Sequence, residues 1–379
     1  MTKHYSKRDF LKQSSVGMLG AMALSACPPV LRGSIPADEV KPKHKREARF
    51  YINTPKGVRC EICPNKCTLK EGELGDCHNR LAEDEKLYTI AYGNPAAVHL
   101  DPIEKKPLYH FLPSSTALSI ATAGCNLSCL NCQNYQISQK GPRETDNYDL
   151  MPEKVVDTAI GYNSKVIAYT YTEPITFYEY MYDTSVIAHR NDIKNVMVTA
   201  GYIRPEPLKK LTKVIDAANV DLKSFSDDIY LRLNAGELQP VLDTLKMMKD
   251  EGVWVEITNL IVPQWTDDLD MIKRMCNWLA ENGFDENPLH FSRFHPTYKL
   301  TQLQPTSEYT LKEAMRIAKQ EGIKHVYIGN VPGADSDDTI CPNCEKVLIE
   351  RKGFRVTENH IRRGKCKYCD TPISGKWYG

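Results

Sequence analysis

Residues 124–134 read Gly-Cys-Asn-Leu-Ser-Cys-Leu-Asn-Cys-Gln-Asn and follow directly on a β-rich run at 118–122. The three cysteines, Cys125, Cys129 and Cys132, have the spacing C-x3-C-x2-C. Three thiolates at this spacing can hold three irons of a [4Fe–4S] cube and leave the fourth iron open. Catalytic sites keep such an open metal position, whereas structural sites are closed by a fourth ligand. The spacing alone leaves an alternative, which is a zinc or closed-cluster site whose fourth ligand lies elsewhere.

An alternation of strand-like and helix-like runs begins near residue 116. Strands separated by helices indicate parallel βαβ units, and nearly continuous apolar strands indicate a sheet that is covered on both faces. The periodicity fits both a closed or partial (β/α) barrel and an open doubly wound sheet. The expected strands are 118–122, 166–172, 196–200, 220–222, 253–260 and 289–293, and a last short run at 325–328 is a candidate seventh.

Composition limits the classes of partner. The chain has 379 residues, with 49 Lys and Arg against 48 Asp and Glu. A net charge of +1 argues against nucleic acid as a partner, because proteins held by phosphate attraction are usually more basic. No apolar run reaches the ~20 residues that are needed to span a bilayer.

Most of the 13 cysteines lie in three clusters, and such short spacings suit metals better than structural disulfides. Near the C-terminus, two C-x2-C pairs stand 21 residues apart, which predicts a closed tetrahedral zinc ribbon, with a rubredoxin-like iron site as the alternative. The N-terminal cluster, C-x2-C-x3-C-x9-C, fits either zinc or an auxiliary iron–sulfur cluster. The C-terminal ligands are Cys341, Cys344, Cys366 and Cys369, and the N-terminal ones are Cys60, Cys63, Cys67 and Cys77.

The C-x3-C-x2-C motif after the first strand resembles that of the radical S-adenosylmethionine (radical SAM) superfamily. This resemblance implies an α/β fold, a partial (β/α)6 TIM-like barrel, with a [4Fe–4S] cluster and S-adenosylmethionine (SAM) as cofactors. The chain is most similar to the radical SAM component of the AmmeMemoRadiSam system, which is related to the pyruvate formate-lyase activating enzymes. The matching segments are 60–67 with 75–77, 132–138, 169–174 and 329–333.

The resemblance also implies which residues contact SAM. Glu173, after the second strand, would receive the ammonium group of SAM. Asp221 and Lys223, on one side of the fourth strand, would hold its ribose hydroxyls and its carboxylate. The residues alone leave simpler interpretations open: Glu173 as a helix-start acid before a proline, and the Asp221–Lys223 pair as a local salt bridge. Further candidates for contacts with the nucleoside are Asn259, His295 and Tyr135.

The N-terminus resembles an export signal. Residues 6–12, Ser-Lys-Arg-Asp-Phe-Leu-Lys, are similar to the twin-arginine motif with Lys in place of the first Arg, and an apolar stretch follows at 16–26. The next residue, Cys27, is a candidate for lipidation. We therefore expect an exported lipoprotein, attached to the membrane only through the lipid on Cys27, and a cytoplasmic protein is the alternative. The expected organisation is a signal at 1–27, a tether at 28–48, a four-Cys module at 49–112, the radical SAM barrel at 113–334 and a zinc-ribbon-like tail at 335–379.

Taken together, these features predict a radical SAM enzyme. A reducing electron donor would supply the cluster, and a 5′-deoxyadenosyl radical made from SAM would abstract hydrogen from a protein or peptide substrate. An alternative from another class is a non-catalytic electron-transfer or metal-binding protein. A third is a radical SAM enzyme with a small-molecule substrate.

Overall fold

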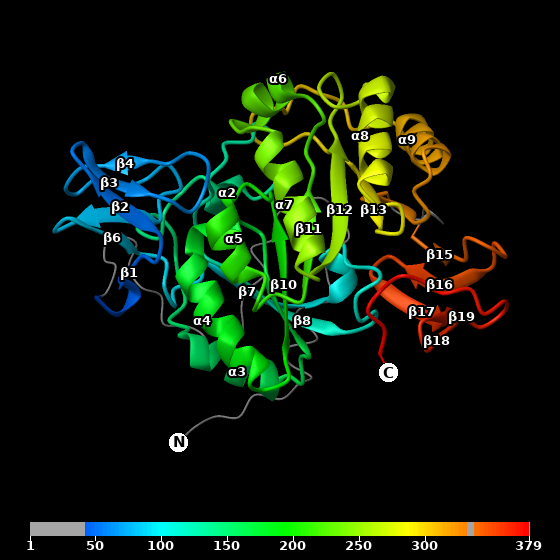
Figure 1. Cartoon of the computed structure of the whole chain (residues 1–379), viewed down its shortest axis with the longest axis horizontal. Coiled ribbons are helices and arrows are strands. Elements are labelled where there is room, and N and C mark those ends of the chain that lie inside the picture. The colour runs from blue at the N-terminus through cyan, green and yellow to red at the C-terminus, as the bar shows by residue number, and fades with distance from the viewer. Residues whose placement is uncertain (1–41, 332–336, 379) are drawn as a thin grey trace.

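The computed structural model describes residues 42–331 and 337–378 (Figure 1). The predicted export signal, the lipid site at Cys27 and most of the tether lie outside these residues. Among the helices that are described, none has the length and apolar character needed to cross a membrane.

The centre of the molecule is one mostly parallel sheet in the order β14-β13-β12-β11-β10-β9-β8-β7. Because strand order follows chain order without reversal, the sheet winds in one direction as barrels do, whereas doubly wound sheets reverse. The predicted α/β class is confirmed, although the described part of the chain holds seven parallel strands rather than six. These are β8 (Thr116–Ala121), β9 (Val166–Tyr169), β10 (Lys194–Thr199), β11 (Ala217–Asp221), β12 (Trp254–Ile261), β13 (Leu289–Arg293) and β14 (Val326–Gly329).

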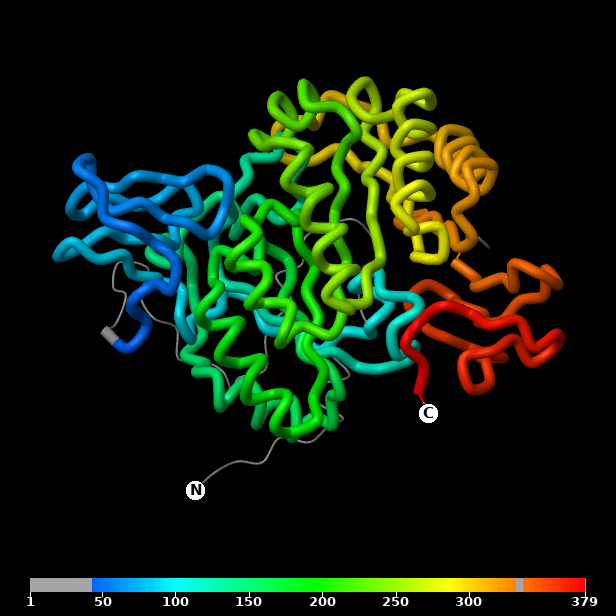
Figure 2. The backbone as a smooth tube through the Cα atoms, in the orientation of Figure 1, coloured from blue at the N-terminus to red at the C-terminus, as the bar shows by residue number. Residues whose placement is uncertain are grey.

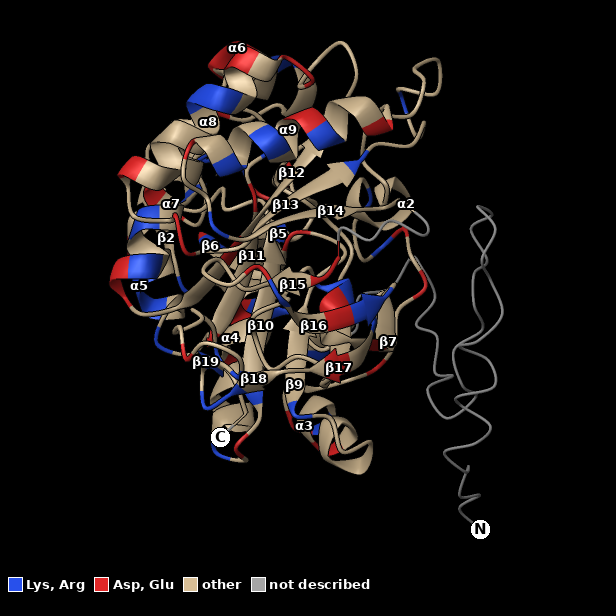
Figure 3. Ribbon diagram, turned by 90° about the vertical axis from the view of Figure 1, so that its right-hand side faces the viewer, with Lys and Arg blue, Asp and Glu red and all other residues tan. Residues whose placement is uncertain are grey.

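Helices cover the outer face of the sheet (Figure 1). In α8, Asp268 caps the first turn by accepting the N–H groups of Asp270 and Met271, and one face, which includes Cys276, is buried. The longer helices are α3 (Pro152–Gly161), α4 (Tyr178–His189), α5 (Pro205–Leu211), α7 (Gln239–Asp250), α8 (Leu269–Glu281) and α9 (Glu308–Gln320). The short ones are η2 (Pro42–His44), η3 (Ile103–Lys105), α2 (Tyr135–Ser138), η4 (Pro174–Phe177), α6 (Asp227–Ile229) and η5 (Tyr230–Asn234). Basic and acidic side chains are interspersed along α5 and α9 (Figure 3).

Two small sheets form a module on one side of the barrel. One sheet has the order β1-β6-β5 and the other β2-β3-β4. The four-Cys module is predicted over residues 49–112, but β7 (Ala97–Pro102) pairs antiparallel with β8 and extends the central sheet. The strands of the module are β1 (Arg46–Glu47), β2 (Tyr51–Thr54), β3 (Gly57–Cys60), β4 (Thr68–Leu69), β5 (Arg80–Glu83) and β6 (Lys86–Thr89).

The C-terminal tail lies on the opposite side of the barrel (Figure 2). Hydrogen bonds join it to residues 109–112. Among them, Arg351 Nη2 donates to Tyr109 O (2.9 Å), Lys376 N–H to His110 O (2.7 Å) and Leu112 N–H to Lys376 O (2.8 Å). The tail therefore docks against the segment between β7 and β8. Its strands are β15 (Thr339–Ile340), β16 (Val347–Lys352), β17 (Arg355–Asn359), β18 (Ile361–Arg362) and β19 (Lys365–Cys366).

Candidate functional site

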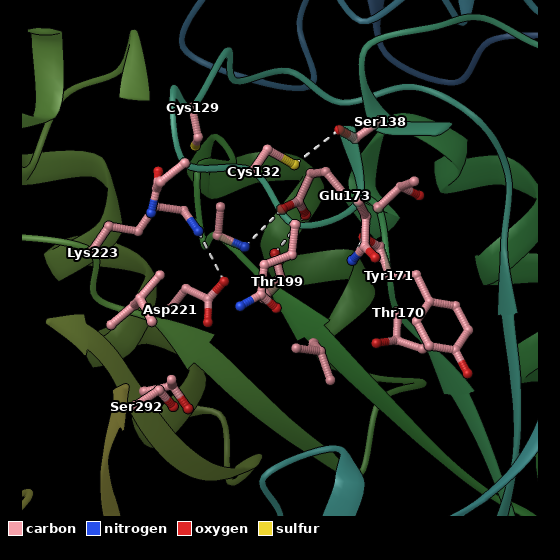
Figure 4. Close-up of a pocket in the computed structure, with 18 of the residues that line it drawn as sticks. Cys129, Cys132, Ser138, Thr170, Tyr171, Glu173, Thr199, Asp221, Lys223 and Ser292 are labelled. Carbon is pink, nitrogen blue, oxygen red and sulfur yellow. Dashed lines mark hydrogen bonds and ion pairs between the residues drawn. The ribbon is translucent and has the colours of Figure 1, made fainter. Parts of the chain in front are cut away.

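A cavity of about 570 Å³ lies at the carboxyl ends of the parallel strands, where (β/α) barrels carry their chemistry (Figure 4). Its wall includes residues that follow β8, β9 and β11, together with side chains within β10 and β12. The cysteine loop after β8 supplies one part of the wall, and charged residues after β9 and β11 supply others. Parallel strands thus bring together residues that are about 100 positions apart in the sequence.

All three cysteines of the loop line this cavity. Each sulfur has a hydrogen-bonding neighbour: Leu127 N–H for Cys125 (3.4 Å), Asn234 Nδ2 for Cys129 (3.2 Å) and Ser138 Oγ for Cys132 (3.1 Å). Burial raises the pKa of the Cys125 thiol well above its ordinary value. A bound metal would favour the thiolate form of this cysteine, because metal binding stabilises the deprotonated sulfur.

The donor set and its spacing fit a cluster that is larger than a single ion. Within the described residues, no three of the loop's sulfur and neighbouring ligand atoms lie within 4.8 Å of one another, as they would around one zinc. The wall also carries buried oxygen atoms without a hydrogen-bond partner, which suit the amino and hydroxyl groups of a nucleoside ligand such as SAM. They are Asn131 Oδ1, Asn234 Oδ1 and Thr258 Oγ1.

Glu173 lies on the cavity wall, and its carboxylate is fixed by the next strand. It accepts hydrogen bonds from Thr199 Oγ1 (2.5 Å) and Ala200 N–H (2.7 Å), and it also caps η4 through Ile175 N–H (3.4 Å). The helix-start interpretation is therefore correct in geometry, but the residue faces the cavity as well. Burial raises its pKa to about 7, despite these hydrogen bonds.

Asp221 and Lys223 form an ion pair on the same wall, with 2.9 Å between Asp221 Oδ2 and Lys223 Nζ (Figure 4). Burial alone would lower the pKa of Lys223, but Asp221 and the nearby Cys129 raise it well above its ordinary value. The predicted salt bridge is present, and both partners also face the cavity. A cation and an anion side by side can receive a zwitterionic ligand.

Three other candidates do not line the cavity. Asn259 turns away and donates to Leu222 O (2.7 Å). The ring of Tyr135 stacks on Tyr298, with 4.6 Å between ring centroids. His295 is exposed and reaches the site only indirectly, through Asn330 O at 3.3 Å from its Nε2.

Several residues that sequence reasoning missed lie on the wall. They come from strand ends, from η5 and from the tail, whose Phe354 in the turn between β16 and β17 also lines the cavity. Asn131, directly before the third cysteine, is one of them, and its place inside the cysteine motif is the local signal that could have found it. The other missed residues include Thr170, Thr199, Asn234, Thr258, Ser292 and Asn330.

The two terminal cysteine clusters differ in geometry. In the C-terminal one, all four sulfurs lie within 4.8 Å of one another, with Cys341–Cys369 at 3.6 Å and Cys344–Cys366 at 3.7 Å. The predicted N-terminal cluster is not gathered in this way: its four cysteines line a second, smaller pocket without meeting that spacing. Among the residues the structure describes, the compact four-cysteine group is thus at the C-terminal end.

Comparisons with known proteins indicate the family of the chain. The family model described as "Radical SAM superfamily" matches residues 119–279. An uncharacterized protein of Methanocaldococcus jannaschii is 48% identical over 331 residues, which cover 86% of this chain and 98% of that protein. The pyruvate formate-lyase 1-activating enzyme of Escherichia coli is 26% identical over 218 residues, which cover 54% of this chain and 89% of the enzyme. A solved radical SAM methyltransferase from Sphaerobacter thermophilus gives a TM-score of 0.46 at 15% identity, covering 60% of this chain and 71% of that chain.

Proposed function

This chain belongs to the radical SAM superfamily, and from that premise we propose that it is an enzyme of the activating-enzyme type. It holds a [4Fe–4S] cluster on Cys125, Cys129 and Cys132, binds SAM, and acts on a protein or peptide substrate. Once bound and reduced, the cluster would supply one electron for cleavage of SAM to methionine and a 5′-deoxyadenosyl radical, the species that would take a hydrogen atom from the substrate. The observation that carries the proposal is the shared cavity, in which three cysteines face Glu173 and the Asp221–Lys223 pair.

The chain's own side chains position the cofactor. The Glu173 carboxylate, held by Thr199 and Ala200, receives the ammonium group of SAM. Lys223 faces the carboxylate of SAM, and Asp221 faces its ribose hydroxyls. The parallel sheet fixes these groups before the ligand arrives, so little of the binding free energy is lost to ordering them.

The substrate class rests on the similarity to the pyruvate formate-lyase 1-activating enzyme, whose name states that it acts on another enzyme. A cavity of about 570 Å³ is large enough for SAM together with a side chain or a peptide loop. We therefore favour a glycyl or other backbone-accessible position of a polypeptide as the hydrogen donor.

The test is made anaerobically on chain reconstituted with iron and sulfide. With a strong one-electron reductant and SAM, we expect 5′-deoxyadenosine, detected by mass, and none when SAM or the reductant is omitted. A fully reduced cluster that neither binds SAM nor yields this product would contradict the proposal and favour a non-catalytic electron-transfer protein.

Binding of SAM should depend on pH through Glu173. Its pKa of about 7 means that the ligand-free carboxyl is largely protonated below pH 7, whereas the ammonium group of SAM needs the ionised form. Proton release must then accompany binding, and we expect affinity about tenfold weaker at pH 6 than at pH 8. Equilibrium dialysis of the reconstituted chain without reductant, so that SAM is bound but not cleaved, measures this directly.

In Glu173→Gln the pH dependence should disappear, and SAM should bind at least about 30-fold more weakly, since a buried charged partner is lost. Glu206→Gln, at an exposed site on α5, is the matched control and should retain both the affinity and its pH profile. An unchanged pH profile in Glu173→Gln would remove Glu173 from the binding site.

We propose zinc for the C-terminal cluster. A tetrahedral site with Zn–S bonds of about 2.3 Å has sulfur–sulfur edges of about 3.8 Å, close to the observed 3.6 Å and 3.7 Å. The tail buries only a small core, so its folding should depend on the metal. In Cys344→Ala, about one zinc per chain should be lost, and the tail should become sensitive to limited proteolysis while the barrel stays resistant. Full protection of the tail without zinc would contradict this.

A further inference from the structure

A second pocket lies inside the N-terminal module, where it meets the barrel. We call its four cysteines the N-terminal quartet: Cys60, Cys63, Cys67 and Cys77. They come from the end of β3, the turn after it, and the loop before β5, and Cys60 N–H donates to Cys67 O (3.0 Å) to hold two of them together. The described cysteines form no disulfides, so all four thiols are available as ligands.

The pocket is built to receive negative charge. Arg80, which is 2% exposed, lines it beside the quartet. Its Nη1 donates to Glu179 Oε2 (2.7 Å), but its buried Nη2 has no hydrogen-bond partner. A buried guanidinium with a free donor is costly unless an anion completes it, and thiolates bound to a metal carry such charge.

The spacing of the sulfurs favours a metal group larger than a single ion. Thiolates around one zinc or one iron stand about 3.8 Å apart, and the C-terminal cysteines show that spacing in this structure. Cysteines at the corners of an iron–sulfur cube stand farther apart, at roughly 6 Å, because the inorganic core separates them. Among the described residues, no three sulfurs of the quartet lie within 4.8 Å of one another. In this respect the quartet matches the catalytic loop and differs from the tail.

The quartet also borders the catalytic loop directly. Gly124 has φ of +103°, and a Cβ on it would lie 2.4 Å from Cys77 O, so the two loops touch through backbone. Asn65, inside the quartet, donates from Nδ2 to Asn126 O (3.0 Å). Consecutive residues, Cys125 and Asn126, thus line the two different pockets.

From these observations we propose that the four thiolates of the N-terminal quartet bind a second iron–sulfur cluster. The Arg80 guanidinium balances its negative charge, and the cluster lies against the loop that carries Cys125, Cys129 and Cys132. The closed set of four thiolates leaves no iron open for SAM, so this cluster is distinct in role from the catalytic one. The proposal concerns the metal content of the module and does not depend on which substrate the enzyme uses.

The test counts metals in full-length chain purified and reconstituted anaerobically. In a variant with Cys125, Cys129 and Cys132 all changed to Ala, only the quartet and the tail can bind metal. We expect two to four irons with an equal amount of acid-labile sulfide, and about one zinc. Adding Cys63→Ser and Cys67→Ser should reduce iron to background and leave the zinc. Cys276→Ala, a buried cysteine of α8 outside all clusters, is the control and should change neither count.

Two zinc ions with no iron in the triple variant would overturn the proposal, and so would one zinc with no iron. If the triple variant does not fold, the unmodified chain decides the question. It should hold about four irons more than the catalytic cluster alone accounts for, or about two more if the second cluster is [2Fe–2S]. A total of about four irons with two zinc ions would overturn the proposal. Because metal content is measured without SAM, this result stands apart from the assay for 5′-deoxyadenosine.

Discussion

Cys132→Ala is expected to abolish formation of 5′-deoxyadenosine, lowering its rate by at least about 10³-fold, because the three thiolates act as a unit. Loss of one leaves the cluster with two protein ligands and no fixed open iron. The Cys132 sulfur contacts Ser138 Oγ at 3.1 Å, and we expect the neighbouring fold to tolerate the loss of this contact because alanine is smaller than cysteine. Product is measured by mass after a fixed time with excess reductant.

Ser128→Ala is the matched control for this variant. Ser128 is exposed and lies in the same loop between two of the cysteines, and its substitution should leave the rate within about twofold. Product made by Cys132→Ala at the normal rate would mean that the reaction does not use this loop. Equal losses in both variants would point to a collapsed loop rather than to a missing ligand.

Glu179→Ala should destabilise the chain by about 3–5 kcal/mol, since it leaves the Arg80 charge buried without its partner. Both side chains of this pair are almost fully buried, and Glu179 also accepts the backbone N–H of Arg49 (2.9 Å). Urea denaturation of the metal-loaded chain, followed by fluorescence, gives the change in midpoint. The loss should appear as a lower midpoint of the transition that includes the N-terminal module.

The control for that variant is Glu47→Ala. Glu47 pairs with Lys86 at 2.8 Å, but both side chains are about half exposed, so the midpoint should hardly move. A similar change in urea midpoint in the two variants would show that the stabilisation by the Arg80–Glu179 pair does not depend on its burial.

Much of the barrel could be predicted because parallel strands carry a strong local pattern. The run 289–293 coincides with β13, and the candidate seventh run at 325–328 differs from β14 by one residue. Glu173, Asp221 and Lys223, which the family resemblance implied as SAM contacts, line the cavity because residues at the carboxyl ends of parallel strands meet at one edge of the sheet.

The other residues of the cavity wall could not be predicted, because their positions depend on which way a side chain points and on contacts between distant parts of the chain. Asn259 and Thr258 are neighbours in β12, so their side chains point to opposite faces, and it is Thr258 that lines the cavity. The position of Asn234 depends on η5, a π-helix with no clear sequence signal. Phe354 reaches the cavity from the tail, more than 200 residues after the cysteine loop.

The docking of the tail has a consequence for synthesis of the protein. Residues 109–112 form hydrogen bonds with Arg351 and Lys376, so a segment made early pairs with residues that are made much later. Because a chain emerges from the ribosome N-terminal end first, this segment of the barrel stays unpaired until the tail has been made. Cells would therefore need to keep the nascent barrel from aggregating until then, and a ribosome that stalls before the tail would release a barrel with residues 109–112 unpaired.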